Sequence, residues 1–495
     1  MEPRYLLILE VSQKQAYIFG SRKLRDNLKR SQNIREATTE EFFQKCCGAE
    51  FSTDENLVYS GGGHAVLQFD DGAHAHRVAE MITGEVLRRW PGMEMYAKRM
   101  PYDPQKSPGE NLNLLNAELE KKKALRLASF HRYSFGIDIE IHSIDVPNLT
   151  AEEIATKEAE EEKNEPFFRE WKLTADGEKL AGNDNFLAVV HIDGNAMGTR
   201  VQKIYQKAGN DWDMCRRLLR QFSEEIDAHF EEAYQEMCVE LSEKLYSLGL
   251  EAGRGGCFPV RRIIGAGDDV CFVCAGKLGI SCAVSFIRHL SGKSNSDEQG
   301  YAACAGVCMI HKKYPFRAAY DLTEQLCANA KRFGVSYDNK GGISAIDWHI
   351  EFGQLKDNLG EIRSDYTTDD GGRMELRPYS VIGENVPPLR TFSFFCTVLQ
   401  QLSTETGSLP RSKVKALRDA FRQGEIETAL ALRSARVKHL LELGVEARTP
   451  DWLEQTLREG SVAKSAFLSD GATRRCLYFD AIELMDHIVL WEDLT

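Results

Sequence analysis

Three aspartates occupy positions where the sequence can bring carboxylates together for metal chemistry. Asp193 follows the apolar run 186–192, while Asp268 and Asp269 follow the small residues Gly265-Ala266-Gly267. Carboxylate oxygens are the ligands that hard divalent cations prefer, and a pair of such cations suits an in-line displacement at phosphorus. The pattern therefore predicts a catalytic site built on Asp193, Asp268 and Asp269 that uses divalent metal to act on nucleoside triphosphates.

The residues that follow Asp193 and those that precede Asp268 are small and suit a bound nucleotide. A helix is expected to begin shortly after Asp193, and free N–H groups at a helix start can hold phosphate. Glycine lets a backbone approach a nucleotide closely, since it has no Cβ. The predicted nucleotide-binding residues here are Gly194, Asn195, Ala196, Met197, Gly198, Gly265 and Gly267. The predicted metal ligands are Asp193, Gly194, Asp268 and Asp269.

The elements around these residues follow one recognisable order. A strand over 186–192 ends at Asp193, a long helical stretch covers 212–248, and the strands 260–264 and 270–274 form a hairpin around the glycine-rich turn. Beyond the hairpin we expect a helix over 278–290, a strand over 302–310, a helix with Pro315 at its first position that runs to 333, and a strand over 343–350. This order is that of a ferredoxin-like palm.

The first half of the chain repeats the plan. Its segments are a strand over 5–10, a basic helical stretch over 14–47, a hairpin from 57–60 to 64–69 and a helix over 72–89. The hairpin turn, Gly61-Gly62-Gly63, contains no carboxylate, so we expect a degenerate palm that holds no catalytic metal. Gly61, Gly62 and Gly63 are predicted to contact a second nucleotide across the domain interface. The alternative is that they only form a tight turn.

These repeats predict an α+β protein with two ferredoxin-like palm domains and an α-helical C-terminal domain. The expected division is a degenerate first palm over 1–150, an acidic linker or helical insert over 151–184, a catalytic second palm over 185–390 and a helical domain over 391–495. In the last of these, Val414, Leu417 and Phe421 recur at helical spacing and form one apolar stripe.

The composition argues against a membrane protein, a secreted protein and a protein whose whole surface binds nucleic acid. The 495 residues carry a net charge of −13, which argues against a surface devoted as a whole to nucleic acid. No apolar run is long enough for a membrane helix, and the N-terminus has no signal-peptide pattern, so we expect a cytoplasmic protein. The 13 cysteines are scattered through apolar segments. This favours reduced thiols and, at Cys271 and Cys274, core packing over a zinc site.

On these motifs the chain resembles the large polymerase-cyclase subunit of type III CRISPR effector complexes, a family with two palm domains, a Gly-Gly-Asp-Asp turn and a helical C-terminal domain. Further runs similar to the family are 18–25, 305–307, 314–318, 330–331 and 344–349. The resemblance implies conversion of ATP to cyclic oligoadenylate second messengers in antiviral defence, with two ions of Mg²⁺ or Mn²⁺. It also implies ATP or another nucleoside triphosphate, guide RNA and other effector subunits as partners, and a nucleotide contact for Lys331.

The chain departs from that family in three respects. Asn195 replaces the second carboxylate of an Asp-x-Asp motif, so we expect a weaker second metal, higher activity with Mn²⁺ than with Mg²⁺, and better Mg²⁺-supported turnover in Asn195→Asp. The alternative is that Asn195 faces a base or a backbone group. Ala266 stands where glycine is usual. No histidine-aspartate nuclease domain precedes the strand that begins at residue 5, so no DNA cleavage is expected.

The roles of several polar residues have two interpretations. Lys331 either reaches the triphosphate or only complements the C-terminal end of its helix. His349 is expected to be structural. A basic cluster either contacts RNA, a nucleotide or an acidic partner, or is a solvated helix face; it comprises Arg22, Lys23, Arg25, Lys29 and Arg30.

Two functions are alternatives to that of an oligoadenylate cyclase. One is a non-catalytic or weakly active scaffold subunit of an RNA-guided type III complex, and the other is a cyclic dinucleotide synthase. GGDEF diguanylate cyclases and class III adenylate cyclases share the palm and its metal geometry, but they usually pair two separate chains or halves. Two palms fused in one chain favour the CRISPR-type subunit.

Overall fold

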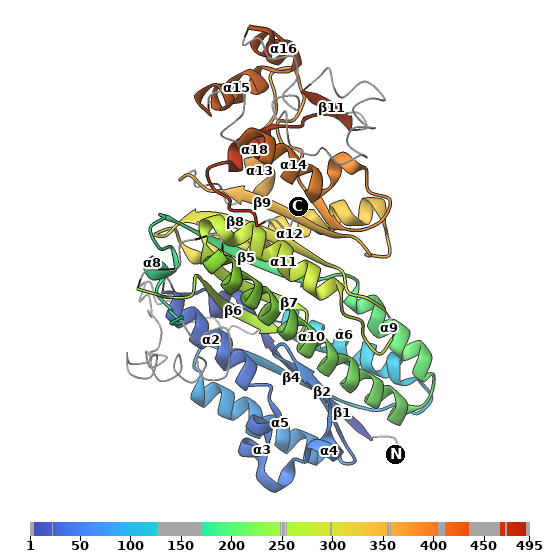
Figure 1. Ribbon diagram of the computed structural model, residues 1–495. Helices are drawn as coiled ribbons and strands as arrows, with labels where there is room; N and C mark the ends of the chain where they lie inside the picture. Colours follow the sequence, from blue (N-terminus) through green and yellow to red (C-terminus); the bar gives the residue numbers. More distant parts are fainter. Residues whose placement is uncertain are drawn as a thin grey trace.

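The structure is a computed structural model that describes residues 4–21, 23–125, 171–247, 255–297, 299–353, 358–403, 411–434, 466–470 and 473–491, with the single positions 249, 253 and 356. Arg22 and the acidic tract 151–165 lie outside these residues. Figure 1 shows two sheets in succession along the molecule, with the N-terminal elements at one end and the helices of the C-terminal part at the other.

The N-terminal sheet is antiparallel, with the strand order β2-β3-β1-β4. The elements of this part are β1 (Tyr5–Ser12), α1 (Lys14–Ile18), α2 (Leu24–Glu36), α3 (Glu40–Cys47), α4 (Thr53–Asn56), β2 (Leu57–Gly61), β3 (His64–Phe69), α5 (Gly72–Arg89), β4 (Glu94–Pro101) and α6 (Pro108–Ala124). Residues 6–9 of the central strand β1 are fully buried, as its apolar run predicts. The helix α6 begins with a capping box between Ser107 and Glu110.

The second sheet has six strands in the order β10-β9-β8-β5-β7-β6. Its part of the chain comprises α8 (Gly177–Leu180), β5 (Phe186–Gly194), α9 (Met197–Ala208), α10 (Trp212–Ser247), β6 (Val260–Ala266), β7 (Asp269–Ala275), α11 (Gly279–Ser291), β8 (Ala303–His311), α12 (Phe316–Tyr337), β9 (Ser344–Ile350), α13 (Leu359–Ser364) and β10 (Tyr379–Ile382). Strands β8 and β9 are parallel, because α12 connects them, and the other pairs are antiparallel. The predicted palm order is confirmed.

Helices α11 and α12 cover opposite faces of the second sheet. A Cβ on Gly279 of α11 would touch Val307 of β8, whereas a Cβ on the preceding strand residue, Gly306, would touch the backbone of α12 at Thr323. Neighbouring residues of a strand point to opposite faces. The alternation in β5 places His191 and Asp193 together on the α12 face, because the two residues are two positions apart.

The two palms are packed directly against each other. The long helix α10 contacts both α11 and the first-palm strand β2, and Figure 1 shows it crossing the molecule beside α11. The indole N–H of Trp212 donates to Gln68 at 2.6 Å. The ring of Phe19 stacks on that of Tyr320, with centroids 4.1 Å apart. Contacts from the N-terminal ends of α10 and α12 therefore fix the first palm against the second.

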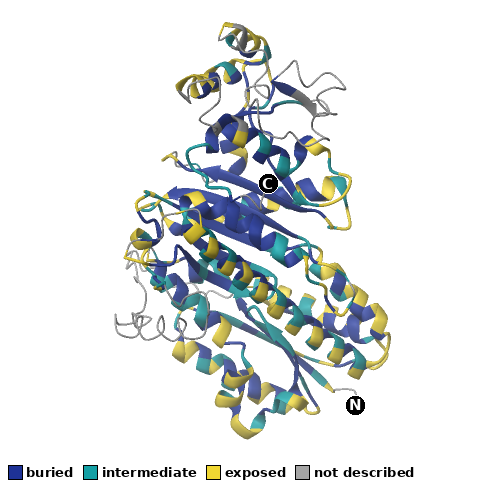
Figure 2. Ribbon diagram, in the orientation of Figure 1, coloured by how far each residue is buried: buried dark blue, intermediate teal, exposed yellow. Residues whose placement is uncertain are grey.

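The C-terminal part is mainly helical but also contains a β-hairpin. Its elements are α14 (Phe392–Ser403), α15 (Arg411–Gln423), α16 (Glu425–Ser434), β11 (Phe467–Asp470), β12 (Thr473–Cys476) and α18 (Phe479–Leu484). Val414, Leu417 and Phe421 are buried on one side of α15, which confirms the predicted stripe, and Figure 2 shows the buried layer beneath these helices. The hairpin of β11 and β12 is an addition to the predicted helical domain. The division at 150, 184 and 390 stays a proposal.

The structure also tests the predictions for Pro315, for Cys271 and Cys274, and for membrane-spanning helices. Pro315 is the N-cap of α12 in an extended conformation, rather than its first helical residue, and the helix continues to Tyr337. Cys271 and Cys274 are both fully buried, which agrees with core packing. None of the helices in the described ranges is long and apolar enough to cross a membrane.

Candidate active site between two glycine-rich turns

Strand β5 and the turn between β6 and β7 bring the three aspartates together. Asp193 is the register partner of Asp269 across the antiparallel pair of β5 and β7. The backbone N–H of Gly194 donates to the carbonyl of Asp268 at 3.1 Å. A Cβ at Gly194 would lie 2.9 Å from the Cβ of Asp268, so this approach requires glycine. The structure thus places the three aspartates side by side, as the sequence predicts.

The carboxyl of Asp268 is half-buried next to another acid. Burial raises its pKa first, the negative charge of Asp193 raises it further, and together they bring the pKa from 3.8 to about 7. Without metal, the ionised form of this carboxyl is disfavoured. A bound cation would stabilise that ionised form. The electrostatics of Asp268 therefore match a cation site.

This shift predicts that Asp268→Asn stabilises the metal-free protein above pH 7. The folded state binds the Asp268 proton more tightly than the unfolded state, so the corresponding stability is present at low pH and is lost as pH rises from about 4 through about 7. Asparagine removes this loss, and at about pH 8 we expect a gain of roughly 1 kcal/mol or more in the free energy of unfolding. Melting curves across this range with a chelator provide the measurement. An unchanged pH dependence in Asp268→Asn would contradict the assignment.

Lys331 of α12 reaches the same strand end. Its ammonium group lies 2.6 Å from Asp193 Oδ2 and 2.9 Å from the carbonyl oxygen of Gly194. Burial lowers the pKa of Lys331, but the charge and the hydrogen bond of Asp193 together outweigh burial and the pKa is raised. Lys331 is therefore a charged partner of two predicted metal ligands, rather than only a complement to the end of its helix.

His191 is a site residue that the sequence analysis does not identify. Its Nε2 lies 3.0 Å from Asp269 Oδ1, and its ring packs against that of Tyr320. Burial lowers the pKa of His191, but the hydrogen bond and charge of Asp269 outweigh burial and the pKa is raised. His191 therefore orients one oxygen of Asp269. Its position two residues before Asp193, on the same face of β5, is a signal that sequence reasoning could have used.

The side chain of Asn195 faces the backbone rather than the aspartates. Its Nδ2 donates to the carbonyls of Gly341 and Ile343 at 3.2 and 2.8 Å. This geometry favours the alternative in which Asn195 is not a metal ligand. The physical reason is that the loop before β9 presents two carbonyl oxygens, which an amide can satisfy and a carboxylate cannot.

We therefore expect Asn195→Asp to destabilise the protein and to leave its metal preference unchanged. An aspartate would place a negative charge against the carbonyls of Gly341 and Ile343, at a cost of roughly 1–3 kcal/mol. Thermal melting gives the stability, and a titration of Mg²⁺ and Mn²⁺ gives the metal dependence. Improved Mg²⁺-supported turnover in Asn195→Asp would instead place position 195 in the coordination shell.

Only part of the predicted phosphate-binding segment, residues 194–198, has backbone N–H groups available for a phosphate. The N–H groups of Gly194 and Asn195 already donate to the carbonyls of Asp268 and Ala302, which corrects the prediction that both are free for phosphate. Ala196 caps α9 with a left-handed backbone, at φ 58°. Met197 and Gly198, at the start of α9, line the cavity described next. Within the segment 194–198, Met197 and Gly198 are the residues that face a nucleotide-sized space.

A cavity of about 390 Å³ opens between the glycine-rich turns of the two palms. The turns approach so closely that a Cβ at Gly62 would lie 3.7 Å from the carbonyl oxygen of Ala266. Lys14 Nζ donates to the Gly62 carbonyl at 2.5 Å and holds the first turn in place. The residues around the cavity include Lys14, Tyr59, Gly61, Gly62, Gly63, His64, Met197, Gly198, Phe222, Gly265, Gly267, Asp268 and Asp269.

Two side chains from outside the hairpin hold the turn that carries Asp268. Asp227 of α10 accepts a hydrogen bond from the N–H of Gly267 at 2.5 Å. Arg35 of the first-palm helix α2 donates to the carbonyl of Gly265. Gly267 has a left-handed backbone with φ 64°, which favours glycine at that position. Neither Asp227 nor Arg35 carries a local sequence signal, because both act across long chain separations.

The remaining candidates have structural partners. Arg25 pairs with Asp26 at 3.7 Å and Arg30 donates to the carbonyl of Tyr17 at 3.0 Å, so the described part of the basic cluster belongs at least partly to the fold of α1 and α2. His349 lies 3.7 Å from Glu351 and is buried, in agreement with a structural role. Within the described residues, no three His, Cys, Asp or Glu side chains converge closely enough to hold a metal ion.

Comparisons with known proteins agree with this architecture. Residues 186–338 match the family model "Cas10/Cmr2, second palm domain". A Csm1–Csm4 cassette in complex with cA3 has a TM-score of 0.57 at 13% identity, covering 99% of this chain and 70% of the matched chain. Csm1 of T. onnurineus has a TM-score of 0.56 at 13% identity, covering 98% and 69%. At these identities the structural likeness concerns the fold. No curated protein matches the chain significantly.

Proposed function

We propose that this chain, a Cas10-like protein whose residues 186–338 form a second palm domain of the Cas10/Cmr2 family, is a metal-dependent nucleotidyltransferase that joins ATP into cyclic oligoadenylates. The main support is the cavity of about 390 Å³ between the two glycine-rich turns, which has Asp268 and Asp269 in its wall. Similar Csm1–Csm4 cassettes are described in complex with one ATP and with cA3. These likenesses favour adenine nucleotides as the substrate class.

The donor set fits Mg²⁺ or Mn²⁺. Asp193 Oδ2 and the Gly194 carbonyl already converge on a cation, the ammonium of Lys331, and the half-buried acid Asp268 lies beside them. Oxygen-only donors of this kind suit hard divalent ions. Asp193, Asp268, Asp269 and Gly194 are thus the proposed ligands. When bound, two such ions activate the attacking hydroxyl and neutralise charge on the leaving pyrophosphate.

The protein groups around the cavity would position two nucleotides. The N–H groups of Met197 and Gly198 are at the start of α9, where phosphate is favoured. The turn Gly61-Gly62-Gly63 would lie against the second nucleotide, because it faces the same cavity from the first palm. His191 would hold Asp269, while Asp227 of α10 and Arg35 of α2 would hold the turn Gly265-Ala266-Gly267. Orientation across two palms is what joining two nucleotides requires.

The proposed setting is a type III effector complex in antiviral defence. Solved structures with the same fold contain Csm1 together with Csm4, so a Csm4-like subunit is a proposed partner, along with guide RNA. The expected lack of DNA cleavage stays a prediction. Incubation of the pure protein with single-stranded DNA and divalent metal tests it.

A specific observation favours a scaffold subunit with a weak site as the second candidate. Lys331 holds Asp193 and Gly194, and in the described part of the chain no three metal-binding side chains converge. If this arrangement persisted with nucleotide present, the carboxylates could not hold two ions. Such a protein would bind partner subunits normally and convert nucleotides slowly or not at all.

Product analysis separates these functions. The purified protein is incubated with each of the four nucleoside triphosphates and either Mg²⁺ or Mn²⁺, and products are identified by mass spectrometry. The proposal predicts cyclic oligoadenylates from ATP alone. Cyclic dinucleotides would favour a dinucleotide synthase. Absence of any product, including in the presence of partner subunits and target RNA, would favour the scaffold.

A further inference from the structure

The ammonium of Lys331 has the contacts expected of a small cation. It lies 2.6 Å from a carboxylate oxygen of Asp193 and 2.9 Å from the carbonyl oxygen of Gly194. Both oxygens are among the proposed metal ligands, and both lie at the end of β5. Lys331 comes from α12, which covers this face of the sheet over much of its length. The position of the ammonium is therefore set by a packed helix rather than by a loop.

The first palm contains an equivalent pair. Glu10 of β1 is the register partner of His64 in β3, as Asp193 of β5 is the partner of Asp269 in β7. Lys123, from α6, lies 3.1 Å from Glu10. Helix α6 follows β4 in the same way that α12 follows β8. Each palm thus places a lysine from the helix that follows β4 or β8 on an acid of its first strand.

The first palm shows that the lysine–carboxylate pair forms without the aspartates of a metal site. The first-palm turn has glycines where the second palm has Asp268, and its pair forms nevertheless. A lysine–carboxylate pair at this place is therefore a property of the palm fold that does not depend on a neighbouring pair of aspartates. Only in the second palm does the lysine occupy oxygens that a divalent ion would also need.

We propose that Lys331 is a resident cation of the catalytic palm, which occupies the Asp193–Gly194 position in the nucleotide-free protein and must move away before a divalent ion can bind there. This inference rests on the proposed function for the identity of the ligands. An ammonium group and a divalent ion repel each other at this separation, so they cannot share Asp193 Oδ2. The triphosphate of an incoming nucleotide offers the displaced lysine a new anionic partner. The second ion therefore binds together with the nucleotide.

Binding of Mn²⁺ to the nucleotide-free full chain tests the inference. Free Mn²⁺ is measured by electron paramagnetic resonance during a titration of wild type, Lys331→Met and Lys123→Met. We expect Lys331→Met to bind an additional ion, or to bind Mn²⁺ at least about tenfold more tightly than wild type. Lys123→Met removes the same charge at the equivalent position of the first palm and is expected to bind Mn²⁺ as wild type does. The gained binding should disappear in Lys331→Met combined with Asp193→Asn.

Equal Mn²⁺ binding by wild type and Lys331→Met would overturn the inference. Lys331→Gln provides a second variant if Lys331→Met fails to fold, and Lys331→Arg, which keeps the charge, should bind as wild type does. The test is separate from that of the proposed function. Gain of an ion without any nucleotide conversion would retain the inference and reject the cyclase, whereas conversion with unchanged ion binding would do the reverse.

Discussion

The double variant Asp268→Ala/Asp269→Ala is expected to lose nucleotide conversion by at least about a thousandfold while its fold survives. Both carboxylates belong to the wall of the cavity between the two palms. Without them the site keeps Asp193, which Lys331 already holds, so no divalent ion would be fixed next to the cavity. The loss should appear in the rate of conversion with saturating ATP, measured with both Mg²⁺ and Mn²⁺.

A matched control separates loss of the site from loss of charge. Glu80→Ala/Glu85→Ala removes two carboxylates from α5, where Glu80 and Glu85 make ion pairs with His76 and Arg88 near the surface. This variant should convert nucleotides as wild type does. Circular dichroism checks that all three proteins are folded. Turnover at the wild-type rate in the aspartate double variant would remove Asp268 and Asp269 from the mechanism.

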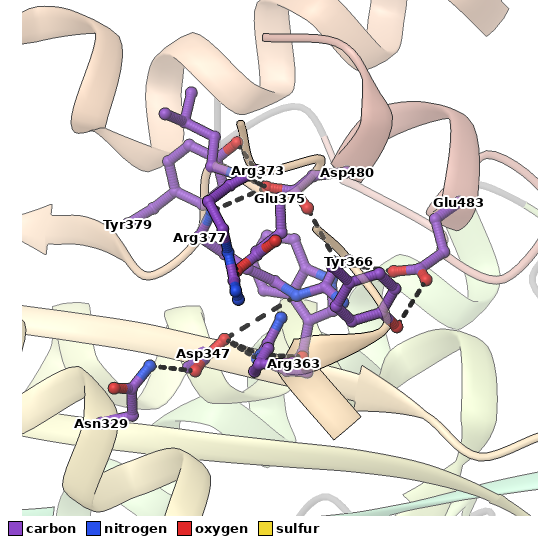
Figure 3. Close-up of polar contacts among 12 residues, drawn as sticks. Asn329, Asp347, Arg363, Tyr366, Arg373, Glu375, Arg377, Tyr379, Asp480 and Glu483 are labelled. Carbon is purple, nitrogen blue, oxygen red and sulfur yellow. Dashed lines mark hydrogen bonds and ion pairs between the residues drawn. The ribbon is translucent and has the colours of Figure 1, made fainter. Parts of the chain in front are cut away.

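Arg377→Met is expected to be the most destabilising single substitution that we propose. The Arg377 guanidinium is fully buried and lies 2.8 Å from Asp480 and 2.6 Å from Glu483, both on α18. It also faces Asp347 of β9 at 3.9 Å. Figure 3 shows Arg377 among these carboxylates. Removing the arginine leaves the buried carboxylates of Asp480 and Glu483 without their cationic partner, at a cost of about 3–5 kcal/mol.

The rest of the network compensates only Asp347, which also pairs with Arg363 at 2.7 Å. Asp480 already accepts from the backbone N–H groups of Leu376 and Arg377 and from the hydroxyl of Tyr379, and none of these donors is cationic. Chemical denaturation gives the free energy of unfolding. Arg317→Met is the control, since its pair with Asp321 is exposed and should contribute less than about 1 kcal/mol. A cost for Arg377→Met as small as that of the control would contradict the structural role of the network.

Much of the second palm could be predicted from sequence because its signals are local. The apolar run before Asp193 and the glycine-rich turn before Asp268 define adjacent strands, and the strand order then brings the aspartates together. The first palm's edge strand β4 gives no such signal. It pairs with β1 on one side only, and it carries Lys98 and Arg99 on opposite faces, where Lys98 pairs with Glu118 of α6 and Arg99 donates to the carbonyl of Gly72 at the start of α5.

The electrostatic details of the site could not be predicted in the same way. Lys331 lies 138 residues from Asp193 along the chain, and Asn195 contacts carbonyls of the loop before β9. Arg35 reaches Gly265 from the other palm. Each contact depends on how α12, the loop before β9 or α2 packs, which the residue pattern of a single segment does not contain. The hairpin of β11 and β12 was missed for a related reason, since its arginines Arg474 and Arg475 pair with distant acids.

The phosphorus product formed from ATP reports directly on nucleotidyl transfer by the second palm. Nucleotidyl transfer breaks the bond between the α- and β-phosphates of ATP and releases pyrophosphate. Simple hydrolysis at the terminal phosphate releases orthophosphate. The decisive measurement is therefore the ratio of pyrophosphate to orthophosphate formed from ATP as the sole nucleotide, with Mn²⁺, in wild type and in Asp268→Ala/Asp269→Ala. We expect pyrophosphate in proportion to the ATP consumed, and none from the double variant; orthophosphate as the main product, or pyrophosphate at the same rate from both proteins, would contradict nucleotidyl transfer by this palm.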